Sequence, residues 1–148
     1  MTANPTEAIN GSEYDATHQH SYPREYLEGI AQFNAGRYYD AHETWEAIWL
    51  RSAGDTRLFY HMLIQAAVAL YHHERGNAHG ARTLYERACK KLQKLPAQLM
   101  SLDVREVEQQ FKTFFAASSE KEVEAAPAGD KPRPLIRLNV EVETEANR

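Results

Sequence analysis

Apolar residues recur every three or four positions through most of the chain, which is the spacing of one face of an α-helix. Proline, glycine and capping residues divide this pattern into five segments. The predicted helices cover residues 23–34, 38–51, 55–75, 77–95 and 104–117. Asp55, Asn77 and Asp103 are the expected N-caps, because their side chains can accept a hydrogen bond from the first turn. Residues 97–100 add a short helical turn, so the pattern predicts an all-α fold.

The third helix is apolar nearly all round, because Gln65 is the one polar residue between Met62 and Tyr71. Such a helix is expected to run through the centre of a bundle. A buried glutamine offers up to four hydrogen bonds, and leaving one unmade costs about 1 to 3 kcal/mol. Polar partners for Gln65 are therefore expected on the neighbouring helix, which carries His42, Glu43 and Glu46.

The second and fourth helices are similar to each other at a spacing of 40 residues. Aligning Gly36 with Gly76 places Trp45 over Tyr85 and also pairs alanines 41 and 81. Each copy is then the second helix of a helical hairpin, in which the alanine lets two helices approach closely. The pattern resembles tetratricopeptide-like pairing and predicts two packed helical hairpins plus a fifth helix. The alternative is that two amphipathic helices match at a few positions by chance.

Both ends of the chain lack the helical pattern. Residues 1–21 are polar and are predicted to form a flexible leader before a helical domain at 22–117. Residues 118–148 begin with a linker composition and end with an alternation from Leu138 to Val142 that predicts an extended segment. A single strand needs a partner, so this segment is expected either to pack on its own helices or to pair with a second copy in a homo-oligomer.

Composition bounds the class of protein. A chain of 148 residues with 43% hydrophobic residues is long enough to bury one core. The formal net charge of −4 argues against a dedicated nucleic-acid or anionic-membrane binder. Cys89 is the one cysteine and cannot form an internal disulfide, and neither a signal peptide nor a membrane-spanning run is evident. The predicted location is therefore the cytoplasm.

Candidate chemistry gathers in the second helix, where residues three or four apart share a face. One interpretation is a binding site for a small molecule or a protein, in a groove where the tryptophans are partly exposed. Its candidate residues are Tyr39, His42, Glu43, Trp45, Glu46, Trp49 and Gln65. A second interpretation is a purely structural polar cluster of His42, Glu46 and Gln65 with either His61 or His72, which would keep the helices in register.

A third interpretation is a metal-dependent site or hydrolase. His42 and Glu46 have a spacing similar to that of the zinc-binding helix His-Glu-x-x-His, and His72 would supply a third ligand. This interpretation requires a divalent metal, and no other cofactor is expected. An enzyme is not favoured, because the sequence contains neither a nucleophile beside an obvious base nor a glycine-rich phosphate loop.

The fourth helix has a basic C-terminal half, made by Arg87, Lys90, Lys91 and Lys94. Basic residues near a helix C-terminus are stabilised by the helix dipole and need no partner. Nucleic-acid binding through these residues is not favoured, since the net charge of the chain is negative.

Residues 33–49, 59–72 and 75–81 resemble a family of small prokaryotic helical proteins catalogued as domain of unknown function 309. The residues that carry this resemblance are Phe33, Asn34, Gly36, Ala41, His42, Glu43, Glu46, Trp49, Gln65, Gly76 and Asn77. The resemblance covers about residues 25 to 95 and implies a compact all-α bundle with no established activity. The chain departs from the family at His61 and Met62, where Gln-Gly is expected, so family membership implies no role for His61.

Overall fold

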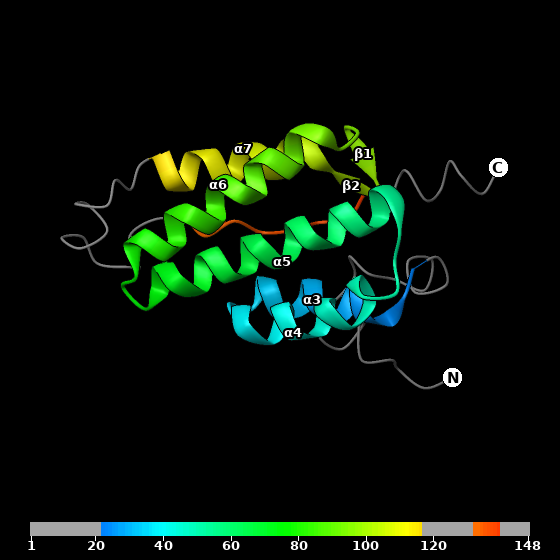
Figure 1. Cartoon of the computed structure of the whole chain (residues 1–148), viewed down its shortest axis with the longest axis horizontal. Helices are drawn as coiled ribbons and strands as arrows, with labels where there is room; N and C mark the ends of the chain where they lie inside the picture. Colours follow the sequence, from blue (N-terminus) through cyan, green and yellow to red (C-terminus); the bar gives the residue numbers. More distant parts are fainter. Residues whose placement is uncertain (1–21, 117–131, 140–148) are drawn as a thin grey trace.

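The computed structural model describes residues 22–116 and 132–139 and has an all-α fold (Figure 1). Its helices and strands are α3 (Arg24–Asn34), α4 (Tyr38–Trp49), α5 (Gly54–Glu74), α6 (Ala78–Lys94), β1 (Gln98–Leu99), β2 (Leu102–Asp103) and α7 (Val104–Ala116). The predicted helices are confirmed to within two residues at every end. The leader at 1–21 and most of the linker lie outside the described residues, so their predicted character stays a prediction.

The helices form two layers. Figure 1 shows α5 between α4 and α6, with α3 behind α4 and α7 behind α6. Residues 132–139, which we call the strap, run behind α5 between α3 and α7. The two faces of α5 that meet neighbours are buried, as its apolar sequence predicts. None of the helices between residues 22 and 116 combines the length and apolarity that a membrane crossing requires.

The predicted repeat is visible in the two hairpins, α3–α4 and α5–α6. Each turn contains a glycine in the left-handed region, Gly36 at φ +82° and Gly76 at φ +78°, where a side chain would be strained. Ala41 of α4 and Ala81 of α6 occupy corresponding positions and are both buried. The two hairpins therefore have a glycine at the same point of the turn and a buried alanine at the same point of the second helix.

Two local predictions are wrong. Asp55 does not cap α5, because the helix begins at Gly54 with Ala53 as its N-cap, a residue whose side chain makes no capping hydrogen bond. Residues 97–100 belong to a tight hairpin of β1 and β2, with Met100 and Ser101 both at positive φ. Hydrogen bonds hold this turn from distant parts of the chain, including Tyr22 Oη to Ser101 Oγ at 2.7 Å. The other two caps are confirmed: Asn77 accepts from Gly80 N–H, and Asp103 from Glu106 N–H.

The strap packs against its own helices through side-chain amides that bind its backbone. Asn34 accepts from Ile136 N–H and donates to Ile136 C=O, both at 2.8 Å. Gln110 makes the same pair with Leu135, at 2.9 and 2.8 Å. Ile136 and Leu138 are buried in the core. Of the two expectations for the C-terminal segment, packing on its own helices is therefore confirmed for these residues, whereas Val140 to Val142 lie outside the described range.

Candidate functional site

Trp45 is a core residue, although it was expected to be partly exposed in a groove. Its side chain is 0% exposed, and its indole N–H donates to Tyr26 C=O at 3.3 Å. Gly29 of α3 leaves the space for the ring, since a Cβ at this position would collide with the indole. The prediction that Trp45 forms a wall of a binding site is therefore wrong.

Trp49 is half-buried on the side of α4 that meets α5. The His61 ring is stacked on it, with ring centroids 4.8 Å apart and planes inclined by 29°. The Arg57 guanidinium lies 4.7 Å from the centroid of the Trp49 ring, which is a cation–π contact. Trp49, His61 and Arg57 thus make one aromatic and cationic cluster near the α4–α5 turn.

A second cluster lies at the other end of α4. Tyr39 is 49% exposed, and its ring lies 5.4 Å from that of Tyr71. The guanidinium of Arg75 lies 5.3 Å from the centroid of the Tyr71 ring. His42 is half-buried beside Tyr39, with its Nδ1 3.3 Å from the Tyr39 carbonyl oxygen. The two clusters occupy opposite ends of the same pair of helices.

Gln65 lies on α5 between these clusters. Its Oε1 is buried and has no hydrogen-bond partner among the described residues. Glu43 and Glu46 are exposed, because they lie on the outward stripe of α4 with Tyr39 and Leu50. The expected hydrogen bonds of Gln65 with His42 or Glu46 are therefore not formed.

The predicted metal ligands do not converge. Within residues 22–116 and 132–139, no three His, Cys, Asp or Glu side chains are close enough to hold a metal ion. His72 lies near the end of α5, where its Nδ1 is 3.3 Å from Asn77 Nδ2. The structure therefore does not bring His42, Glu46 and His72 together as a set of three ligands.

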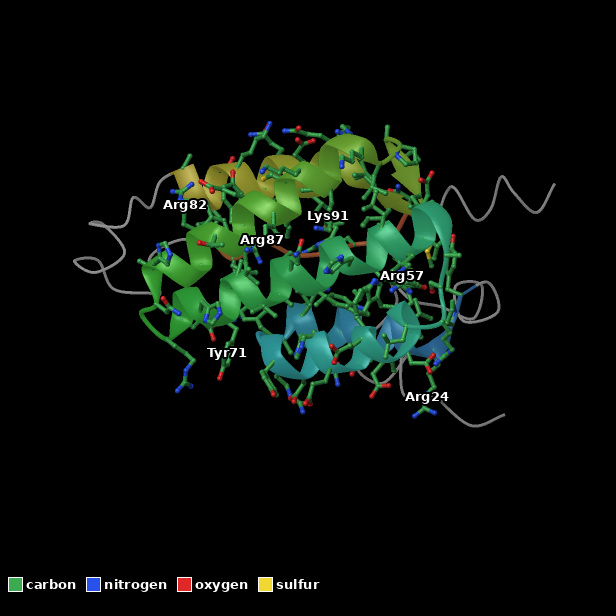
Figure 2. The ribbon with its side chains drawn as sticks, viewed as in Figure 1. Arg24, Arg57, Tyr71, Arg82, Arg87 and Lys91 are labelled. Atoms are coloured by element: carbon green, nitrogen blue, oxygen red, sulfur yellow. The ribbon has the colours of Figure 1, made fainter. Side chains whose placement is uncertain are left out.

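The fourth helix contributes residues that sequence reasoning had assigned only to the helix dipole. In Figure 2, Arg87 and Lys91 lie along the line where α6 meets α5, and Arg57 lies further along α5. Burial lowers the pKa of the half-buried Lys91, and the charges of Arg87 and Lys94 lower it further. Burial likewise lowers the pKa of His61, followed by the charges of Lys91 and Arg57.

We call this surface of α4, α5 and α6 the front face. Its residues are Tyr39, His42, Trp49, Arg57, His61, Gln65, Tyr71, Arg87 and Lys91. None of the three cations on it forms an ion pair with a carboxylate in the described part of the chain. The sequence does contain one indication that Arg87 and Lys91 belong to this face. They are four residues apart and so share one side of α6, as His61 and Gln65 share one side of α5.

Comparisons with known proteins agree with this fold, and the descriptions of the similar proteins name no activity. The model of a family described as domain of unknown function (DUF309) matches residues 26–84. The uncharacterized protein YpuF of Bacillus subtilis is 39% identical over 74 residues, which are 49% of this chain and 42% of that protein. The chain thus matches less than half the length of this curated relative. A conserved hypothetical protein of Thermus thermophilus, known from its crystal structure, is 33% identical with a TM-score of 0.54, over 64% of this chain and 97% of its own.

Proposed function

Because the chain belongs to the domain of unknown function 309 family, whose description assigns no activity, we propose a function from its geometry. The protein is a binding module that holds an extended segment of a partner protein on its front face. The observation that carries this proposal is the pair of aromatic and arginine clusters at the two ends of the face.

The composition of the clusters supports binding to a protein. Tryptophan, tyrosine and arginine are the residues that contribute most often to the binding energy of protein interfaces. Tyr39 is far more exposed than an aromatic ring needed for the core would be, whereas Trp45, Phe33 and Phe59 fill the core itself. The rings of the front face are also held in place before binding by their mutual contacts, which lowers the entropy lost on association.

The spacing of the clusters supports an extended segment as the ligand. His61 and Tyr71 are ten residues apart on α5, and a helix rises about 1.5 Å per residue, so the clusters are separated by roughly 15 Å. An extended peptide of about five residues spans that distance. A small molecule that filled one cluster would leave the other without a role.

A peptide array tests the proposal. We would probe cellulose-bound peptides of about twelve residues and fully varied composition with the purified chain, with Tyr39→Ala and with Trp49→Ala. Each substitution removes the ring at one end of the face, and we expect retention on the strongest peptides to fall about tenfold, equivalent to about 1.4 kcal/mol.

Leu50→Ala is the matched control, because Leu50 is an exposed apolar residue next to Trp49 but belongs to neither aromatic and arginine cluster. It should change retention less than twofold, and circular dichroism should show that all three variants remain helical. If no peptide is retained, or if Tyr39→Ala and Trp49→Ala bind as the unmodified chain does, the proposal is wrong.

A further inference from the structure

We propose that the groove between α3 and α7 is a second binding site, which takes an extended segment of a partner protein, and that the strap is its built-in competitor. The strap occupies this groove and so shows the chemistry that the site accepts (Figure 1). The inference goes beyond the proposed function, because the groove lies behind α5 and shares no residue with the front face.

The groove holds the main chain of the strap as a peptide-binding site holds an extended ligand. Asn34 of α3 makes two hydrogen bonds with the backbone of Ile136. Gln110 of α7 makes two with the backbone of Leu135. All four bonds use backbone atoms of the strap, so another extended segment that follows the same path can make them.

The end of the strap is added to the small sheet. Leu138 forms an antiparallel bridge with Leu102 of β2, and Asn139 N–H donates to Ser101 C=O at 2.7 Å. Addition of a strand to the edge of a sheet is a common way for one protein to bind an extended segment of another. The groove therefore offers main-chain partners along the segment and a sheet edge at its end.

Alternate residues of the strap set the specificity of the groove. Pro134, Ile136 and Leu138 are buried, whereas Arg133 and Arg137 are exposed. This two-residue period is that of an extended segment with one side turned toward its site. A competing segment therefore needs apolar side chains at every second position and tolerates charged residues between them.

The strap leaves part of its groove unfilled on the side of α7. A hollow of about 520 Å³ lies between residues 132–134 and one side of α7, between Glu106 and Phe114. A smaller hollow of about 180 Å³ lies beside Leu135 and Arg137. Ligand pockets have volumes of roughly 300 to 1,000 Å³, so the larger hollow has room for a bulky apolar side chain that the strap does not carry. A segment with such a side chain adds contacts to those of the strap and binds more tightly.

The competition between the strap and a free segment has a definite scale. A segment attached by a short linker binds as though it were present at a concentration on the order of 1 mM. A free peptide with the sequence of the strap, at about 1 mM, should therefore displace about half of it. A peptide that binds about tenfold more tightly should displace about nine tenths at the same concentration.

The displacement test uses the isotope-labelled full chain and unlabelled peptides of residues 132–139. The strap sequence is compared with its Pro132→Trp, Arg133→Trp and Pro134→Trp forms and with a scrambled peptide of the same composition. We expect at least one tryptophan peptide, at about 1 mM, to lower the intensity of the docked Ile136 amide signal about tenfold. The scrambled peptide should leave this signal unchanged.

Ile136→Asp supplies an independent readout, because a carboxylate is costly to bury and the strap should then leave the groove. A fluorescent peptide with the strap sequence should bind this variant at least about tenfold more tightly than the unmodified chain, since its competitor is gone. Adding Asn34→Ala should weaken that binding about tenfold through the loss of two hydrogen bonds. Tyr39→Ala, on the front face, is the control and should act less than twofold. If circular dichroism shows that Ile136→Asp does not fold, the displacement measured on the unmodified chain decides.

Three results would overturn the inference without contradicting the proposed function. The first is an Ile136 signal that none of the tryptophan peptides affects. The second is a displacement that Tyr39→Ala abolishes, which would place the peptides on the front face. The third is a dimer in sedimentation equilibrium at micromolar concentration that Ile136→Asp dissociates, which would assign the groove to the strap of a second copy.

Discussion

Gln65→Met measures what the buried amide of Gln65 contributes to the stability of the fold. Methionine keeps the length and flexibility of glutamine and removes the amide. The buried Oε1 has no hydrogen-bond partner in the described part of the chain, and an unsatisfied acceptor of this kind costs the folded state about 1 to 3 kcal/mol. We therefore expect the substitution to raise the free energy of unfolding by about 1 kcal/mol, after allowing for imperfect packing of the new side chain.

Gln110→Met is the matched comparison, because it makes the same chemical change at a satisfied amide. Gln110 accepts from Leu135 N–H and donates to Leu135 C=O. Losing both hydrogen bonds should lower the free energy of unfolding by about 2 kcal/mol. The two substitutions thus have opposite expected signs, although they remove identical atoms.

Urea unfolding followed by far-ultraviolet circular dichroism measures both variants. If each variant has the same m-value as the unmodified chain, the surface exposed on unfolding is unchanged. A shift in the urea midpoint then reports a change in stability alone. For a folded region of this size, about 1 kcal/mol corresponds to a shift in Tm of roughly 4 °C. A loss of 1 kcal/mol or more in Gln65→Met would refute the reasoning and would favour the interpretation of Gln65 as a structural residue that keeps the helices in register.

Three further predictions concern the strap, the core and the front face. Asn34→Ala should lower the free energy of unfolding by about 2 kcal/mol and speed hydrogen exchange at Ile136 N–H; unchanged exchange would contradict the pairing. Gly29→Ala should cost about 1 to 3 kcal/mol in urea unfolding, because its Cβ collides with Trp45, and a loss below 0.5 kcal/mol would show that the ring moves freely. The nuclear magnetic resonance titration of His61 should have its midpoint below 6.5, since burial and neighbouring cations lower its pKa. The unfolded chain then binds the proton more tightly, so the stability that His61 contributes should rise with pH up to about 6.5, a slope that His61→Phe abolishes.

The helices were predictable because their signals are local. Gly36 and Gly76 end helices by their own backbone freedom, and Asn77 caps the next helix with its own side chain. The hairpin at residues 98–103 was missed because Met100 and Ser101 adopt positive φ without glycine, held by contacts that sequence spacing does not reveal. The partner of the strap was likewise left open, since Asn34 lies 102 positions from Ile136.

The candidate site was predictable only in part. Helical spacing lets either Trp45 or Glu46 share the stripe of His42 and Trp49, and it does not decide whether Trp45 lies in the core or lines a groove. That choice depends on α3, where Gly29 leaves room for the indole. Arg87 and Lys91 join the front face only through the register of α5 against α6, which two separate helical patterns do not fix.

Mapping of backbone amide chemical shifts tests the central claim most directly. The isotope-labelled full chain would be titrated with the peptide that the array retains most strongly. We predict that the largest changes lie on α4 near Tyr39 and Trp49, on α5 near His61 and Gln65, and on α6 near Lys91. Changes that cluster instead on α3, α7 or the strap would contradict the claim that the front face is the binding site.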